Sequence, residues 1–198
     1  MFALQQANKS GKRLLTRMPP TIHFVRHAQG AHNTPGNHDS LLDPGLTEHG
    51  KKQCEELRAS FPHHEGLAAV IASPMSRAIQ TSVEAFARPE LGPVVALDLV
   101  QETSDAPNDI GSSVDELRKI FGKSADLTGV RESWTDKSEG AFFEPEWNKL
   151  LDRTREARRV LRDMIRESDR DIIVVSHGGV LHFLTDDWQD LSLQRRKS

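Results

Sequence analysis

The chain has 198 residues, a formal net charge of −3, nine histidines and one cysteine. This length favours one domain with a sizeable hydrophobic core, and the lone Cys54 excludes a framework of internal disulfides. Hydrophobic residues make up 36% of the chain, and no apolar run approaches the ~18 residues that a membrane helix needs. We therefore expect a soluble, cytoplasmic protein that binds neither membranes nor, because its net charge is negative, nucleic acid.

The amino-terminal part of the chain differs from the rest in charge. Residues 1–38 contain five Lys or Arg and no Asp or Glu. Residues 1–20 are polar and basic and end in Pro19-Pro20, so we interpret them as an extension that precedes a single domain at residues 21–198. A mitochondrial targeting peptide is one alternative for this extension, and a tail that docks loosely or not at all is the simpler one.

Four short apolar runs predict buried strands, since runs that are apolar on both faces suit a sheet covered on both sides. They lie at residues 21–25, 68–72, 94–97 and 171–175. Helical patterns alternate with these runs. The alternation predicts βαβ units, and therefore a three-layer α/β/α sandwich around a mainly parallel sheet.

Capping residues indicate where the helices begin. Thr47 and Ser73-Pro74 are typical helix starts, and Ser113 with Glu116 forms a capping box. The longest helix is expected to start near Pro145 and to end at Glu167-Ser168-Asp169. Its arginines alternate with acidic residues, which is typical of a solvated face; they are Arg153, Arg155, Arg158, Arg159, Arg162 and Arg166. Residues 103–143 contain one convincing helix, and we expect the remainder to form functional loops over the edge of the sheet.

Chemically active side chains follow each predicted strand. The strands run in turn into Arg26-His27, Ser73 to Arg77, Gln101-Glu102, and Ser176-His177-Gly178-Gly179. In an open parallel sheet, ligands bind at the carboxyl ends of the strands. Two arginines, two histidines and one carboxylate would therefore meet in a strongly cationic cleft that suits a phosphate group.

Phosphoryl chemistry can proceed in such a cleft with these side chains alone. Histidine is a nucleophile when a backbone carbonyl fixes its tautomer, and Arg26, Arg77 and His177 can neutralise the transferred phosphoryl group. We therefore expect no metal and no cofactor. The loop after the first strand contains no acidic residue, which fits because a nearby carboxylate would repel phosphate and raise the pKa of His27.

Several polar residues have simpler explanations. The other seven histidines match no zinc-binding pattern, and we interpret them as strand, surface or cleft-rim residues. Asp43-Pro44-Gly45 is most simply a turn. Asp105 and Asp109 lie close enough in sequence to compete with Glu102 for the role of proton donor.

These motifs resemble those of the histidine phosphatase superfamily, the phosphoglycerate-mutase-like proteins. Arg26-His27-Ala28 with Asn33 is similar to its nucleophile motif, and Ser73-Pro-x-x-Arg77-Ala78-x-Gln80-Thr81 is similar to its second phosphate motif. Its remaining landmarks are matched by Leu46-Thr47-x-x-Gly50, Glu102 and Ser176-His177-Gly178. The resemblance implies the family's fold, with His27 as nucleophile, Glu102 as general acid and base, and a phosphate pocket made of Arg26, Asn33, Arg77 and His177.

A second resemblance suggests which branch of the family this is. Gln101-Glu102 followed by Asn108-Asp109-Ile110-Gly111-Ser112 looks like the small eukaryotic, especially fungal, phosphatase-like branch. Two departures from the family pattern matter. Ala28 replaces the usual glycine, which would cost on the order of 1 kcal/mol if the site needed a positive φ. The arginine-rich substrate segment of a mutase is not evident between Glu102 and Trp147.

The sequence therefore predicts a metal-independent phosphomonoester hydrolase that acts on a small phosphorylated substrate through a phosphohistidine intermediate. Two alternatives remain open. One is a catalytically weak phosphate-binding or interaction module on the same fold, and the other is a phosphoglycerate-type mutase. The sequence carries no signal of oligomeric state.

Overall fold

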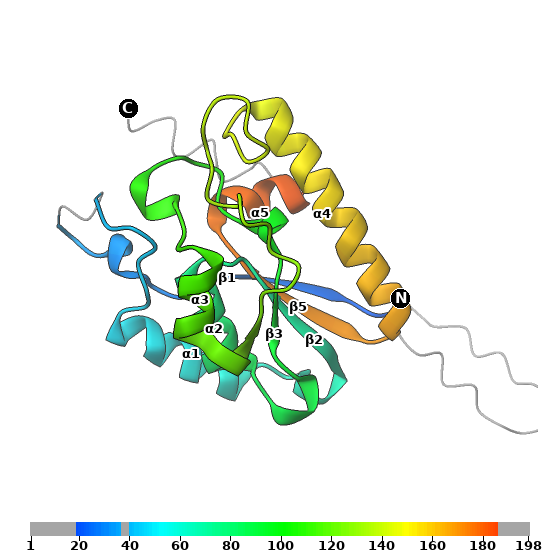
Figure 1. The fold of residues 1–198 in the computed structure, drawn as a ribbon. Coiled ribbons are helices and arrows are strands. Elements are labelled where there is room, and N and C mark those ends of the chain that lie inside the picture. Colours follow the sequence, from blue (N-terminus) through cyan, green and yellow to red (C-terminus); the bar gives the residue numbers. More distant parts are fainter. Residues whose placement is uncertain (1–18, 37–39, 186–198) are drawn as a thin grey trace, which may run out of the picture.

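A parallel sheet forms the centre of the computed structural model, which describes residues 19–36 and 40–185 (Figure 1). The strand order is β1-β5-β2-β3-β4, and every paired neighbour is parallel. The strands are β1 (Ile22–Arg26), β2 (Leu67–Ala72), β3 (Val94–Ala96), β4 (Ala125–Asp126) and β5 (Asp171–Ser176). All four strands predicted from the sequence are confirmed. The fifth, β4, was missed because two residues are too few to show a periodic pattern.

Helices cover both faces of the sheet, as expected for three layers. Figure 1 shows α4 on the opposite side of the sheet from α1 and α2. The helices are α1 (Glu48–Ser60), α2 (Ser76–Phe86), α3 (Val114–Phe121), α4 (Trp147–Ser168) and α5 (Gly178–Thr185). Residues of β5 alternate between two hydrophobic cores, because successive side chains of a strand point to opposite faces. Ile173 and Val175 pack on the α1, α2 and α3 side, whereas Ile172 and Val174 pack against α4 and α5.

Three of the predicted helix ends are present. The Thr47 hydroxyl accepts the Gly50 N–H at 3.0 Å and begins α1. Ser113 and Glu116 form the capping box of α3. The long helix α4 ends at Asp169, which adopts the left-handed conformation.

The predicted start of α2 is wrong. The helix begins at Ser76 rather than after Ser73, and its first N–H group donates to Asp43 Oδ1 at 2.8 Å. Asp43 is buried, and its other carboxylate oxygen accepts the hydroxyls of Ser76 and Ser112. The sequence indicated only a turn here, because no local pattern shows that Asp43 reaches a helix 33 positions later.

The expected extension and the expected domain both lie partly outside the described residues. Of the expected extension at residues 1–20, the structure describes only Pro19 and Pro20. Of the predicted domain at residues 21–198, it describes residues 21–36 and 40–185. Within residues 19–36 and 40–185, no helix is both long enough and apolar enough to cross a membrane.

Candidate active site

The candidate site lies where β1, β5 and β2 end side by side. Arg26 is level with Ser176 across one strand pair, and Ala72 is level with Val175 across the other. The residues that follow continue this pairing, since His27 N donates to Ser176 O at 2.9 Å and Ser73 N donates to Val175 O at 3.0 Å. His27 and His177 consequently come together, with ring centroids 5.1 Å apart.

The geometry of His27 fixes its tautomer. Its Nδ1 lies 2.7 Å from the Ala28 carbonyl oxygen, and a carbonyl can only accept, so Nδ1 carries the proton. The Nε2 atom therefore holds a lone pair, toward which Arg77 Nε donates at 3.3 Å. Burial, together with the nearby charges of Arg77 and Arg26, lowers the pKa of His27 to about 3. The imidazole is thus neutral and nucleophilic at neutral pH.

Ala28 is accommodated without backbone strain. Among the described residues other than glycine, only Asp43 and Asp169 have positive φ. The Ala28 N–H donates to Thr81 Oγ1 at 3.0 Å, and its carbonyl is the group that orients His27. The possible cost of alanine at this position therefore does not arise.

Arg77 extends from the first turn of α2 and is completely buried. Besides its contact with His27, its Nη1 donates to Asn108 O at 2.7 Å and its Nη2 donates to Asp109 Oδ1 at 2.8 Å. The second oxygen of Asp109 accepts the Ser104 hydroxyl at 2.6 Å. The expectation of a strongly cationic cleft is therefore corrected, because a carboxylate from a distant loop reaches the central arginine.

His177 is completely buried between the strands and α5. Its Nε2 lies 2.8 Å from Ser73 Oγ, and that oxygen also accepts the Met75 N–H at 3.3 Å. The Ser73 hydroxyl can donate to His177 Nε2, and in that tautomer the ring proton is on Nδ1. That Nδ1 atom is buried and has no hydrogen-bond partner among the described residues. Burial lowers the pKa of His177 well below its usual value, so this ring is also neutral.

Arg26 and Glu102 lie over the two glycines that begin α5. A Cβ atom at Gly178 would stand 3.7 Å from Arg26 Nε. A Cβ atom at Gly179 would overlap Glu102 Oε1 and would stand 2.6 Å from Thr103 Oγ1. Gly179 therefore lets the proposed acid approach the amino end of a helix, which is also favourable for an anion.

Two buried cations donate hydrogen bonds to the loop that carries Glu102, and the sequence analysis assigned neither of them to the site. Arg153 Nη2 donates to the carbonyls of Gln101 and Glu102, and Lys137 Nζ donates to the Gln101 side chain. Burial lowers the pKa of Arg153 to about 10 and that of Lys137 to about 8. The prediction that Arg153 lies on a solvated face is wrong, since it is only 2% exposed.

His32 and Asn33 both belong to the short 3₁₀ helix that follows β1. Asn33 is exposed, and its Oδ1 accepts the Gly30 N–H at 3.1 Å. His32 was expected on the surface or the cleft rim, but its ring centroid lies 5.6 Å from that of His27. Burial lowers the pKa of His32 to about 4. The sequence held no signal for this, because the three-residue 3₁₀ helix Ala31–Asn33 decides which side chain turns inward.

The two other candidates for the acid differ in their surroundings. Asp109 has one oxygen on Arg77 and the other on Ser104, whereas Asp105 is exposed. Glu102 Oε1 accepts the N–H and the hydroxyl of Thr103. Within the part of the chain that the structure describes, no group of three or more His, Cys, Asp or Glu could hold a metal ion.

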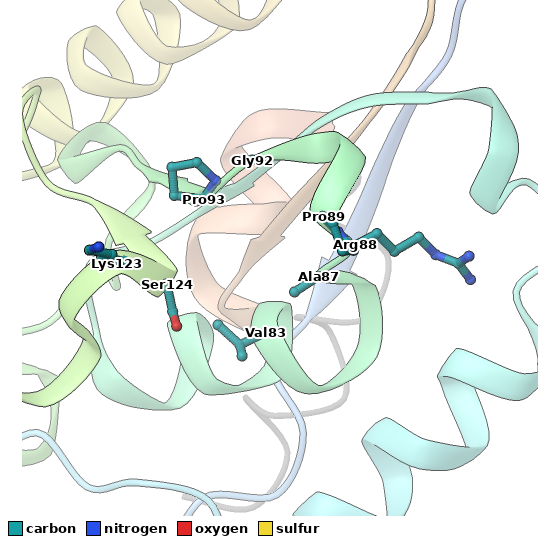
Figure 2. Close-up of a pocket in the computed structure, with 8 residues that line it drawn as sticks. All are labelled: Val83, Ala87, Arg88, Pro89, Gly92, Pro93, Lys123 and Ser124. Atoms are coloured by element: carbon teal, nitrogen blue, oxygen red, sulfur yellow. The ribbon is translucent and has the colours of Figure 1, made fainter.

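A surface hollow of about 390 Å³ lies at the other end of the sheet, beside the residues that precede β3 and β4 (Figure 2). It contains none of the residues discussed above. Its lining is formed by Val83, Ala87, Arg88, Pro89, Gly92, Pro93, Lys123 and Ser124.

Comparison with known proteins identifies the family. Residues 22–198 match the histidine phosphatase superfamily (branch 1). The chain belongs to this family. The expected fold and enzyme class, a phosphatase of the histidine phosphatase type, are confirmed with it.

Relatives of this histidine phosphatase carry names of two kinds. It is 30% identical over 204 residues to a phosphoglycerate mutase-like protein of Arabidopsis thaliana. The alignment covers 83% of this chain and 73% of the relative. It is 26% identical over 164 residues to a probable phosphatase of Schizosaccharomyces pombe, with coverages of 80% and 74%. These two eukaryotic relatives are consistent with the eukaryotic branch suggested by the sequence.

Solved structures show the same fold at low sequence identity. An ecdysone phosphate phosphatase of the silkworm, solved with tungstate, has a TM-score of 0.62 at 14% identity and covers 83% of this chain and 75% of its own. A phosphoserine phosphatase of Entamoeba histolytica, solved with 3-phosphoglyceric acid, has a TM-score of 0.51 at 21% identity, with coverages of 82% and 76%.

Proposed function

We propose that this histidine phosphatase hydrolyses a small phosphomonoester through a phosphohistidine on His27. The observation that carries the proposal is the state of His27. Its proton is held on Nδ1 by the Ala28 carbonyl, its Nε2 lone pair faces the guanidinium of Arg77, and burial keeps its pKa near 3. A neutral imidazole aimed at the group that would bind phosphate is ready to attack phosphorus.

The phosphate group is bound by Arg26, Arg77, His177 and Asn33 in this proposal. The buried, unpartnered Nδ1 of His177 supports it, because a buried N–H without an acceptor is costly and a phosphoryl oxygen would satisfy it. Asn33 would contribute its amide N–H, since its oxygen already accepts from Gly30. Arginine and histidine donors replace the charge that a metal ion supplies elsewhere, so the reaction needs no metal.

The reaction takes place in two steps. In the first, His27 Nε2 forms a bond to phosphorus, the bond from phosphorus to the ester oxygen breaks, and the Glu102 carboxyl gives its proton to that oxygen. In the second, a water molecule attacks phosphorus while Glu102 takes a proton from it, and the bond between phosphorus and Nε2 breaks. Phosphate leaves, and His27 and the protonated Glu102 are restored.

We prefer hydrolysis to mutase activity because the arginines between Glu102 and Trp147 are already paired with acidic residues. A mutase must hold the carboxylate of a phosphoglycerate as well as its phosphate. The two arginines between Glu102 and Trp147 are engaged elsewhere: Arg118 pairs with Asp115 on α3, and Arg131 pairs with Asp98. The name of the Arabidopsis relative keeps the mutase as the second candidate. Transfer of phosphate between positions of phosphoglycerate, faster than its hydrolysis, would favour it.

A test uses p-nitrophenyl phosphate and a panel of phosphorylated metabolites. The full chain should release phosphate, and His27→Ala should not. Brief incubation with ³²P-labelled substrate followed by alkaline quenching should leave a label on the protein that is stable in base, labile in acid and absent from the variant. Equal phosphate release by His27→Ala would disprove the mechanism. Phosphate binding without any turnover would favour the interaction module.

A further inference from the structure

Residues 107–112 form a strap that joins the candidate phosphate site to the rest of the domain. Asn108 O and Asp109 bond to Arg77, Ile110 O accepts the Asp43 N–H, and Ser112 donates to the Asp43 carboxylate. At Gly111 a Cβ atom would overlap the ring of the buried Trp134, so the strap passes directly over this tryptophan. The strap is therefore packed and bonded along its length, and Asp109 is held at the site.

Asp109 occupies the arginine on which phosphate binding depends. Each of the three guanidinium nitrogens of Arg77 already has a protein partner, and the Asp109 carboxylate takes Nη2 at 2.8 Å. The side chains of this ion pair are 1% and 14% exposed, so water screens it little. A guanidinium has five N–H donors, so phosphate can still bind Arg77 beside these partners, but it then stands close to the negative charge of Asp109.

We propose that Asp109 is an internal competitor for phosphate, which occupies Arg77 when the site is empty and weakens the binding of phosphate product. This inference rests on the proposed function and adds to it the control of product release. Arg77 keeps its position through the Asn108 carbonyl and through its own burial, so the carboxylate is not needed merely to hold the guanidinium in place.

The charges of the site support this competition. His27, His32 and His177 all have lowered pKa values and are neutral at pH 7, so they add no positive charge. Arg26 and Arg77 are the fixed cations proposed to bind phosphate, and the carboxylate of Asp109 lies directly on Arg77. Replacing Asp109 by a neutral side chain therefore removes a large fraction of the charge that opposes a phosphate dianion.

The hydrolytic reaction benefits from such a competitor. After the phosphohistidine is hydrolysed, the phosphate product and the Asp109 carboxylate are both negatively charged and lie in one pocket. Pairing with Asp109 therefore lowers the affinity of Arg77 for the free phosphate. A phosphomonoester is also mainly a dianion near pH 7, so the same penalty weakens its binding, and removing the charge should lower KM together with the inhibition constant for phosphate. Weaker binding of the product limits product inhibition.

The test compares variants of the full chain by titration calorimetry with inorganic phosphate and with vanadate. Asp109→Asn keeps the shape and one oxygen that can accept from Arg77, its amide N–H can donate to Ser104 Oγ, and the charge is removed. Asp115→Asn removes an exposed carboxylate from α3 as a matched control. We expect Asp109→Asn to bind phosphate about tenfold more tightly and Asp115→Asn to match the wild type. The inhibition constant for phosphate in hydrolysis of p-nitrophenyl phosphate should fall about tenfold as well.

Equal or weaker phosphate binding by Asp109→Asn would overturn the inference, because it would show that Asp109 serves only to hold Arg77. If that variant does not fold, Asp109→Ala takes its place, since it removes the charge and leaves the bond from Arg77 to the Asn108 carbonyl intact. Tighter phosphate binding by about tenfold is then expected, and unchanged or weaker binding overturns the inference. A wild type that binds phosphate without hydrolysing any ester would refute the proposed function alone.

Discussion

Gly179→Ala separates the catalytic role of Glu102 from the stability of the fold. The added methyl group would overlap Glu102 Oε1 and would stand 2.6 Å from Thr103 Oγ1. Both atoms are ends of side chains that can rotate away, so the helix keeps its backbone and gains up to ~1 kcal/mol in helix propensity over glycine. The carboxyl group, however, must leave its place over the amino end of α5.

Losing a well-placed general acid slows a reaction by roughly 10²- to 10⁴-fold. We therefore expect the kcat of Gly179→Ala to fall about 100-fold, which corresponds to about 2.7 kcal/mol in the activation barrier. The affinity for phosphate should change less than about threefold, because Glu102 donates no hydrogen bond to the phosphate in this mechanism. The Tm should stay within a few degrees of the wild type.

The neighbouring glycine provides a matched control. In Gly178→Ala the new Cβ lies 3.7 Å from Arg26 Nε, an ordinary van der Waals distance, so kcat should stay within about threefold of the wild type. Steady-state hydrolysis of p-nitrophenyl phosphate and thermal unfolding of both variants, with Glu102→Gln beside them, complete the experiment. Wild-type kcat in Gly179→Ala would refute the assignment of Glu102 as the acid.

Three further variants test the structure around the site. Asp43→Ala removes the acceptor of four hydrogen bonds from Ser76 and Ser112, and should lower the free energy of unfolding by about 3 kcal/mol in urea titrations; a loss below ~1 kcal/mol would contradict the buried contacts. Lys137→Gln removes the cation behind the Glu102 loop and should lower kcat about tenfold at nearly constant KM, whereas a rise in KM alone would contradict this positioning role. The pKa of His27 is about 3 in the folded chain and 6.5 when unfolded, so its burial destabilises the fold as pH falls below 6.5, by roughly 1.4 kcal/mol per pH unit. His27→Gln should therefore lose about 2 kcal/mol less than the wild type between pH 6.5 and pH 5 in urea unfolding, and equal losses would contradict the lowered pKa.

The parts of the fold that follow local rules could be predicted from the sequence. The central strand β5 is apolar on both faces because both faces are covered, so its run at 171–175 stands out in the sequence. The polar residues just after such strands could be placed together because the carboxyl ends of parallel strands lie at one edge of the sheet. This is how His27, His177 and Arg77 were found without knowledge of the strand order.

Contacts between distant segments could not be predicted in this way. Arg153 occupies a helix in which arginines alternate with acids, and nothing in that pattern shows that this one arginine turns inward toward Glu102. Lys137 and Asp43 come from irregular segments without any periodicity. In each case the side chain satisfies backbone or side-chain groups that another element leaves unpaired, and such a need is visible only after the elements have packed.

The same limit explains the one error that bears on mechanism. The loop after β1 contains no acidic residue, and the sequence predicted a strongly cationic cleft made of two arginines, two histidines and one carboxylate. The strap brings Asp109 to Arg77 across 32 positions of sequence, and Arg77 also donates to His27, the proposed nucleophile. Absence of acids from a local motif therefore limits only the charge next to His27 in sequence. The charge that a bound phosphate meets is set by the strap, and a phosphatase can use that charge to release its product.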